Sequence, residues 1–134
     1  MLKSLEQERA KYAWECIMEI KEEKELEKKY KSYIKKAPTF IQNSGLGNTL
    51  AFYKSKANSK ASPQKSKNSE KKAYRKIYNH INEWFKMRFE EEDILKWICK
   101  KETSSIEIFR VTKELILLLD WMKKFVEAEL KGEE

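Results

Sequence analysis

Arg75 and His80 are the residues of this sequence best suited to chemistry on a phosphodiester, and they lie five positions apart. An arginine can hold a phosphate while a histidine accepts or donates a proton. On a helix of about 3.6 residues per turn, however, this spacing separates the two side chains around the helix axis. A histidine on the flank of a helical bundle, beside a basic neighbour, is the favoured interpretation, and we expect no catalytic residues.

The spacing also resembles the R-x4-H pattern of HEPN-type ribonucleases, which are helical proteins too. Lys76 stands where those enzymes usually have a polar uncharged or an acidic residue. A HEPN-like ribonuclease that uses Arg75 and His80 is kept as the alternative function. His80 is the only histidine, and the acids at 90–93 point around a helix rather than together. The sequence therefore predicts neither a metal site nor a cofactor.

Positive charge is concentrated in one part of the sequence. The chain has a formal net charge of +7, yet residues 54–76 alone hold nine lysines and arginines and one acid. The remainder, with 20 basic and 21 acidic residues, is nearly neutral. A local excess of this kind attracts a polyanion to one place, and a merely solvated loop is the alternative interpretation. The residues predicted to contact nucleic acid are Lys54, Lys56, Lys71, Lys72, Arg75 and Lys76.

The elements that must position these side chains are helices. Three glycines and two prolines punctuate the 134 residues, and no segment sustains an alternation of polar and apolar residues. The pattern predicts an all-α fold, a compact single-domain bundle of about six to seven helices over residues 1–134, with a long C-terminal helix at its centre. The expected helices cover about 5–23, 26–37, 38–43, 46–57 and 70–88, one that begins with the acids at 90–93, and one from the capping box at 104–107 to about 130.

Glycines and prolines predict where these helices stop. Pro38 is expected to break a helix or to begin a new one. Gly45 and Gly47 are expected to shape a turn before the next helix, whose free N–H groups can hold a phosphate. Residues 58–69 are polar and contain no large apolar side chain, so we expect a flexible basic loop there.

The remaining composition bears on burial and location. Cys16 and Cys99 lie in apolar-periodic segments, so both are predicted to be buried thiols with no disulfide indicated. Most of the four tryptophans are expected in the core. No signal peptide is recognisable and no apolar run exceeds five residues, so we expect a cytoplasmic protein without a membrane segment. Lys and Glu enrichment suits a thermophile, and an AT-rich genome explains it equally well.

The segment from Ser44 to Lys56, SGLGNTLAFYKSK, resembles the NGLG-x-x-LAF-x-x-SK signature of the small Cmr subunit of type III-B CRISPR–Cas effectors. Residues 33–42, which precede it, look like the lead-in of that family. The opening 8–10 and the closing 118–122 and 127–129 are similar as well, so the likeness spans nearly the whole chain. Ser44 stands where asparagine is frequent, a change that still suits the end of a helix.

This resemblance implies a non-catalytic, all-helical subunit of an antiviral ribonucleoprotein. Copies of it would stack in a short filament alongside the backbone subunits that carry the guide RNA and cut the target. Its basic face would hold guide and target RNA without reading sequence, because base pairing supplies specificity. The motif carries over to Lys54 and Lys56 as RNA contacts and to Gly45 and Gly47 as turn residues. The small subunit of type III-A effectors is a further alternative.

Overall fold

The computed structural model describes residues 4–60 and 65–132, and every regular element in these two ranges is a helix. The all-α prediction is therefore confirmed. Within the described ranges, no helix is both long enough and apolar enough to cross a membrane. The helices are α1 (Leu5–Lys21), α2 (Glu27–Ser44), α3 (Leu46–Ala57), α4 (Lys65–Phe89), α5 (Ile94–Ile98) and α6 (Ser105–Glu129).

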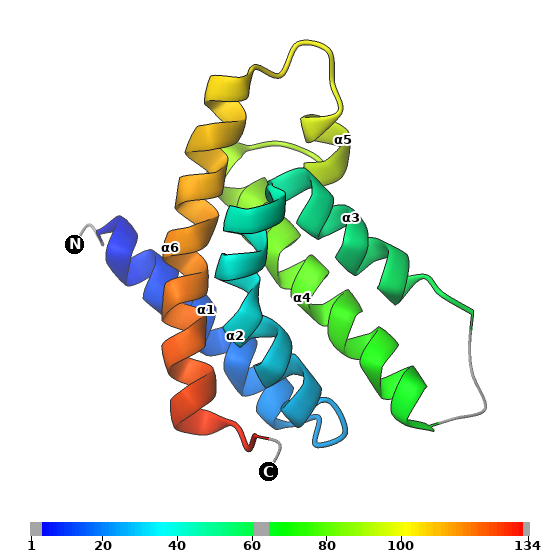
Figure 1. Ribbon diagram of the computed structural model, residues 1–134. Helices are drawn as coiled ribbons and strands as arrows, with labels where there is room; N and C mark the ends of the chain where they lie inside the picture. The colour runs from blue at the N-terminus through cyan, green and yellow to red at the C-terminus, as the bar shows by residue number, and fades with distance from the viewer. Residues whose placement is uncertain (1–3, 61–64, 133–134) are drawn as a thin grey trace.

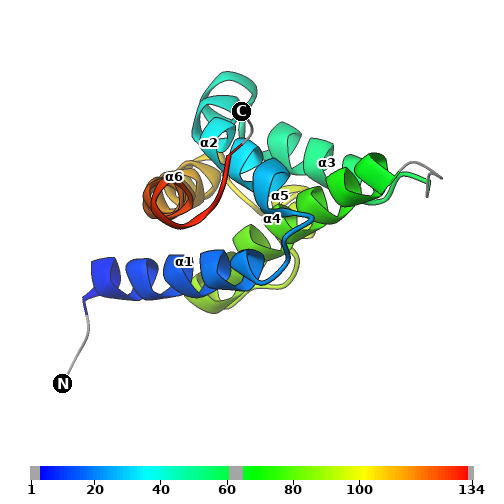
Figure 2. The same ribbon diagram turned by 90° about the horizontal axis from the view of Figure 1, so that it is seen from below.

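α2 is the helix around which the others assemble. It packs against α1, α3, α4 and α6. Seen from below in Figure 2, α6 and α3 lie on opposite sides of it. α1 packs against α6, and α3 runs beside α4, so the bundle consists of two helix pairs joined through α2 (Figure 1).

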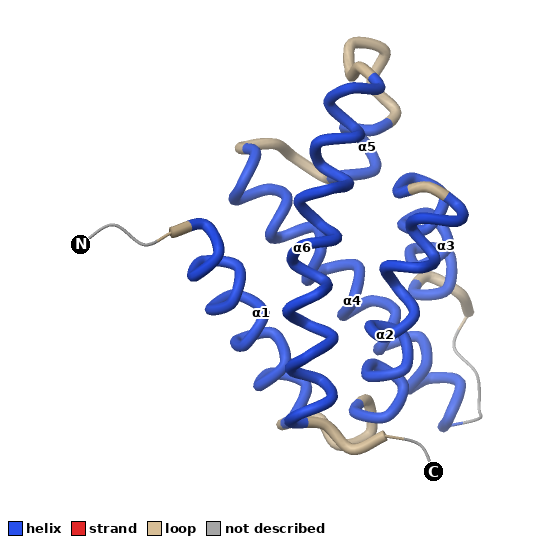
Figure 3. Tube along the Cα trace, turned by 60° about the vertical axis from the view of Figure 1, so that its left-hand side comes forward, coloured by secondary structure: helices blue, strands red, loops and turns tan. Residues whose placement is uncertain are grey.

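α6 lies on the outside of the bundle, so the prediction that the C-terminal helix is central was wrong. One face of α6 packs on α1 and α2 and buries Leu115 and Met122 completely. On the opposite face Ile106, Phe109 and Leu117 are 64%, 59% and 49% exposed. No described helix covers that outward side (Figure 3). Residues 115–119 of α6 are apolar nearly all round because this stretch serves two surfaces, the core and an exposed face.

α2 continues through Pro38, so the predicted break was wrong. Proline has no N–H to donate to the carbonyl of Ile34, a loss that costs roughly 3 kcal/mol in a helix interior. Tyr30, Ile34 and Ile41 nevertheless form one buried stripe that crosses the proline. Packing of this stripe outweighs the local cost, and the helix ends only before Gly45, whose φ is 86°.

The other helix boundaries follow the sequence signals in part. Capping boxes begin α1 after Ser4 and α6 after Ser104, the second of these as predicted. α4 begins at Lys65 rather than at residue 70, so 65–69 belong to a helix and not to the predicted loop. Residues 61–64, the middle of that loop, lie outside the described residues.

The acidic run before α5 lies outside the helix that it was predicted to begin. Glu90 has a positive φ of 54° and follows the last residue of α4. Asp93 is the N-cap of α5, and its carboxylate accepts hydrogen bonds from the N–H groups of Leu95 and Lys96. One carboxylate at the N-cap supplies the acceptor that the free N–H groups need, so the other acids are not required within the first turn.

The two cysteines differ from each other in burial, and so do the tryptophans. Cys16 is buried as predicted, whereas Cys99 is exposed and corrects the prediction, because it follows the last residue of the short helix α5. Trp84 and Trp97 are buried in the core, and Trp14 is 41% exposed. The core prediction for tryptophan therefore holds for the two that face the interior of the bundle.

A buried ion pair joins α1, α4 and α6. Glu114 on α6 is 8% exposed. Its two carboxylate oxygens accept hydrogen bonds from Nε and Nη2 of Arg9 on α1, at 2.6 and 2.8 Å. The indole N–H of Trp84 on α4 donates to the same carboxylate at 3.1 Å. The carboxylate thus accepts hydrogen bonds from both α1 and α4, and these bonds fix where the two helices pack on α6.

We expect Glu114→Ala to lower the free energy of unfolding by about 3 kcal/mol, because it leaves the Arg9 guanidinium and the Trp84 N–H without their acceptor. Asp120→Ala is the matched control, since Asp120 pairs with Lys124 at 3.0 Å on the exposed surface. Such pairs contribute about 0.3–0.5 kcal/mol. Urea unfolding measures both losses, and equal losses would contradict the structural role of Glu114.

Candidate nucleic-acid interface

A first cleft lies where the last turn of α3 meets the first turns of α4, and lysines dominate its lining. Its volume is about 220 Å³. The ammonium of Lys56 lies 5.6 Å from the centre of the Phe52 ring, which holds that side chain on α3. Four lysines stand against one acid in the lining, which consists of Lys56, Ser59, Lys60, Lys67, Glu70, Lys71 and Tyr74.

A second cleft, of about 210 Å³, adjoins the end of α3 and carries two more cations. The Lys54 ammonium lies 5.7 Å from the centre of the Tyr78 ring. Arg75 on α4 donates to the backbone carbonyl of Ala57 at 3.0 Å. Both cations are therefore fixed at the C-terminal end of α3, where positive charge is also favoured by the helix dipole. The lining consists of Lys54, Ala57, Asn58, Arg75, Tyr78 and Asn79.

The structure divides the residues that the sequence predicted as one binding strip. Lys54, Lys56, Lys71 and Arg75 line the two clefts. Lys72 is exposed and lines neither of them. Lys76 turns to the other side of α4, where its ammonium pairs with two carboxylates of α1, Glu19 at 2.8 Å and Glu23 at 3.3 Å.

The predicted glycine turn lies at the opposite end of α3 from these cations. Gly45 makes the turn with its positive φ, whereas Gly47 is inside α3. A Cβ at Gly47 would meet Cγ2 of Ile98 at 3.4 Å, so the residue lets α5 approach closely. α3 has 12 residues, which corresponds to about 18 Å at 1.5 Å per residue. The helix N-terminus and the lysine clefts are therefore separate places.

His80 does not lie on the flank of the bundle, as the sequence analysis favoured, but is 7% exposed. Its Nδ1 lies 2.6 Å from the Tyr30 hydroxyl of α2, and its Nε2 lies 3.1 Å from the Glu19 carboxylate of α1. Tyr12 of α1 also donates its hydroxyl hydrogen to the His80 backbone carbonyl. Both ring nitrogens are engaged between helices, while Arg75 faces α3. The fold does not bring the R-x4-H pair together.

The described residues hold no group of three or more His, Cys, Asp or Glu that could bind a metal.

A family model identifies the chain. The model of the CRISPR-associated protein (Cas_Cmr5) matches residues 5–129, a span that begins with α1 and ends with α6. The chain belongs to this family. As a Cas_Cmr5 protein it is a subunit of a type III CRISPR effector complex, where it works with other subunits. The family is the small-subunit family of type III-B, so the resemblance found in the sequence is confirmed and the type III-A alternative is not favoured.

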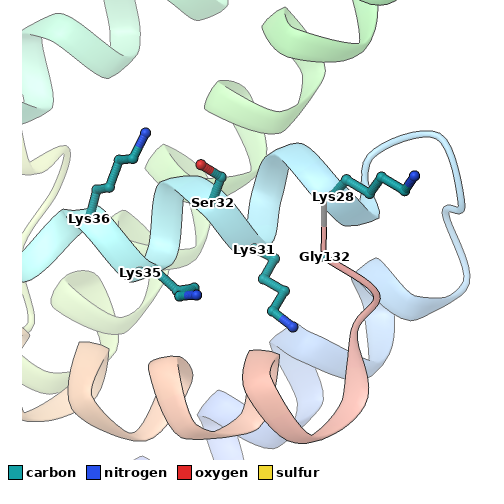
Figure 4. Close-up of a pocket in the computed structure, with 6 residues that line it drawn as sticks. All are labelled: Lys28, Lys31, Ser32, Lys35, Lys36 and Gly132. Carbon is teal, nitrogen blue, oxygen red and sulfur yellow. The ribbon is translucent and has the colours of Figure 1, made fainter. Parts of the chain in front are cut away.

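A second group of lysines on this Cas_Cmr5 chain was missed by the sequence analysis. Residues 28–36, KKYKSYIKK, contain five lysines and no acid. The net charge of the residues outside 54–76 is close to zero, because acids elsewhere offset these lysines, and this sum concealed them. Counting charge in short windows would have found the run. Four of these lysines line a cleft on α2 with Ser32 and Gly132, namely Lys28, Lys31, Lys35 and Lys36 (Figure 4).

The contacts of Glu19 on α1 with His80 and Lys76 on α4 make the stability depend on pH. The hydrogen bond from His80, together with Lys76, lowers the pKa of Glu19 to about 2, from an ordinary value of 4.5. Between these values the unfolded state binds the proton first, so the stability from this group is present above about pH 4.5 and lost as the pH falls toward 2.

We therefore expect Glu19→Gln to lose less stability than the unaltered protein between about pH 6 and about pH 3, as measured by urea unfolding at both values. The matched control is Glu83→Gln, because Glu83 is 57% exposed and pairs with Lys86 on the surface. The control should keep the full acid-induced loss. The same loss in Glu19→Gln and in the control would show that Glu19 does not contribute the pH dependence.

Proposed function

We propose that this Cas_Cmr5 chain is a non-catalytic RNA-binding subunit that holds guide and target RNA through contacts to phosphates. The observation that carries the proposal is the placement of Lys54, Lys56, Lys71 and Arg75 in two adjoining clefts where α3 ends against α4. The two clefts place these four cations together at the C-terminal end of α3. A polyanion that approaches this end meets cations from two helices.

The chemistry of these side chains suits binding that is indifferent to sequence. A lysine ammonium is a compact point charge that attracts a phosphate without recognising a base. Arg75 already donates to the carbonyl of Ala57, which reduces its freedom to form a bidentate contact with a base. In an RNA-guided complex, pairing between guide and target supplies the specificity. A sequence-blind cradle is what such a cytoplasmic ribonucleoprotein requires of a small subunit.

The exposed face of α6 supports the assembly part of the proposal. Ile106, Phe109 and Leu117 place large apolar side chains in contact with solvent along one side of the helix. A contiguous exposed apolar patch on a protein surface can mark a protein–protein contact. We propose that copies of the chain stack in a short filament beside the backbone subunit, and that this face of α6 is buried in the assembly.

Replacing Lys54 and Lys56 with Glu should weaken the binding of single-stranded RNA. Each phosphate contact contributes about 0.7 to the slope of log K against log salt on a single strand, so loss of two contacts should reduce the slope by about 1.4. Lys100→Glu with Lys101→Glu is the matched control, because these lysines are exposed in the segment between α5 and α6 and the charge change is the same. Fluorescence anisotropy at several salt concentrations measures the slope.

The reconstituted effector complex provides the decisive comparison. The Lys54 and Lys56 variant should assemble normally and hold target RNA less tightly than complexes built with the control variant. Unchanged target binding in the assembled complex would contradict the assignment of these lysines, whatever the isolated chain does.

The absence of catalysis is the part of the proposal that a direct assay tests. We expect purified protein to leave labelled single-stranded RNA intact, with and without divalent cations, because the His80 ring is enclosed by Tyr30 and Glu19. Gel electrophoresis over hours is the measurement. RNA cleavage that His80→Ala abolishes, while Glu83→Gln retains it, would establish the HEPN-like alternative instead.

A further inference from the structure

The lysine cleft on α2 is larger than either cleft at the end of α3, at about 490 Å³. Figure 4 shows its side chains on consecutive turns of the helix, with Gly132 of the C-terminal segment beside the first of these turns. Lys31 and Lys35 point toward α6, whereas Ser32 and Lys36 point away from it. The cleft therefore presents ammonium groups and one hydroxyl from a single rigid element.

Two hydrogen bonds fasten the C-terminal segment to α2 and form one wall of the cleft. The Lys31 ammonium donates to the backbone carbonyl of Leu130 at 2.9 Å. The backbone N–H of Lys131 donates to the Glu27 carboxylate at 2.9 Å, and Glu27 is only 4% exposed. Because both bonds join α2 to the residues after α6, the position of Gly132 against the lysines is set by the fold.

The cleft carries an excess of positive charge that the described residues do not neutralise. The Glu127 carboxylate pairs with Lys35 at 2.7 Å and with Lys31 at 3.8 Å. The hydrogen bond from Lys35 lowers the pKa of Glu127, so this acid is ionised. Lys28 and Lys36 have no carboxylate within 4.0 Å in the part of the chain that the structure describes. Among the described residues, the four lysines and one acid have a balance of +3, and the ammonium groups of Lys28 and Lys36 are the two that no carboxylate pairs.

A pair of tyrosines connects this cleft to the first cleft at the end of α3. Tyr33 of α2 stacks on Tyr74 of α4, with ring centres 4.0 Å apart and planes 10° apart. Tyr74 is part of the lining of the first cleft, beside Lys71. Lys36 follows Tyr33 by three residues, so the two are neighbours on the surface of α2. The basic surface thus continues from α3 and α4 across the tyrosine pair to α2.

We infer that the α2 cleft is a second phosphate-binding site, with Lys28, Ser32 and Lys36 as its free ligands, and that it takes the backbone of the same single-stranded RNA that the α3–α4 clefts hold. The inference rests on the proposed RNA-binding function and extends the path of the strand onto another helix. Lys31 and Lys35 are positioning residues, because one fixes the C-terminal segment and the other fixes Glu127.

The test compares three double variants of the full chain, in each of which two lysines become Glu. The first changes Lys28 and Lys36, the second Lys54 and Lys56, and the third is the control at Lys100 and Lys101. Anisotropy with a long and a short oligouridylate measures binding over a range of salt. The Lys28 and Lys36 variant should reduce the salt slope for the long oligouridylate by about 1.4 relative to the control. It should leave the short one, which the α3–α4 clefts can accommodate alone, nearly unchanged.

Amide NMR spectra of the ¹⁵N-labelled chain locate the contact independently of affinity. We expect the long oligouridylate to shift the amides of residues 28–36 and of Gly132, and the short one to shift mainly those of α3 and α4. The milder pair Lys28→Gln and Lys36→Gln should remove the α2 shifts while the other helix signals stay in place, which shows that the variant is folded. Absence of α2 shifts at saturation with the long oligouridylate would overturn the inference.

The design separates failure of this inference from failure of the proposed function. Loss of binding in the Lys54 and Lys56 variant, with the Lys28 and Lys36 variant equal to the control, would reject the α2 site and leave the proposed function standing. Loss only in the Lys28 and Lys36 variant would support the α2 site and reject the α3–α4 assignment. If both variants match the control, neither surface binds RNA.

Discussion

The position of His80 is the constraint on which the rest of this structure depends. Its ring lies between a tyrosine of α2 and a glutamate of α1, with one contact to each ring nitrogen. A buried polar ring needs partners in defined directions, so this arrangement fixes the rotation of α4 about its own axis. That rotation sends Lys76 to the carboxylates of α1, and Lys71 and Arg75 to the end of α3. Together with the buried apolar side of α4, His80 thus decides which cations of the helix are neutralised and which remain available.

The same helix therefore belongs to both the core and the proposed binding surface. The hydrophobic side of α4 buries Ile77, Ile81 and Phe85 completely, which anchors the second half of the helix. The stacked tyrosines and the bond from Arg75 to the last turn of α3 then join the two helices near their exposed ends. Because the cations project from anchored helices, the proposed binding of a phosphate backbone would require little rearrangement of the main chain. Preorganised charges of this kind lose less conformational entropy on binding than charges on a mobile loop.

Local signals predicted the helices well and predicted the surfaces poorly. Ser104 with Glu107 specifies a helix start through two hydrogen bonds between neighbours, so sequence alone suffices. Pro38 predicts a break that does not occur, because its local cost is outweighed by a buried stripe that forms only when α2 is packed. Lys71 and Lys76 look equivalent in sequence, yet the acids that distinguish them come from α1, more than 50 residues away. Which charges are free is a property of tertiary pairing. The lysines of α2 were missed for a different reason, because the charge was summed over too long a stretch of sequence.

The modest charge of each cleft is consistent with a subunit that acts in several copies. A few phosphate contacts on one chain give weak, salt-sensitive binding, because each contact gains mainly from counterion release. When copies line one strand, each later contact is intramolecular, and the affinity of the array rises steeply without any new interaction. A single chain with very strong affinity would bind free RNA everywhere in the cell. Under the proposed function, moderate basic clefts on a helical bundle, multiplied by assembly, would confine tight RNA binding to the complex in which guide and target are already paired.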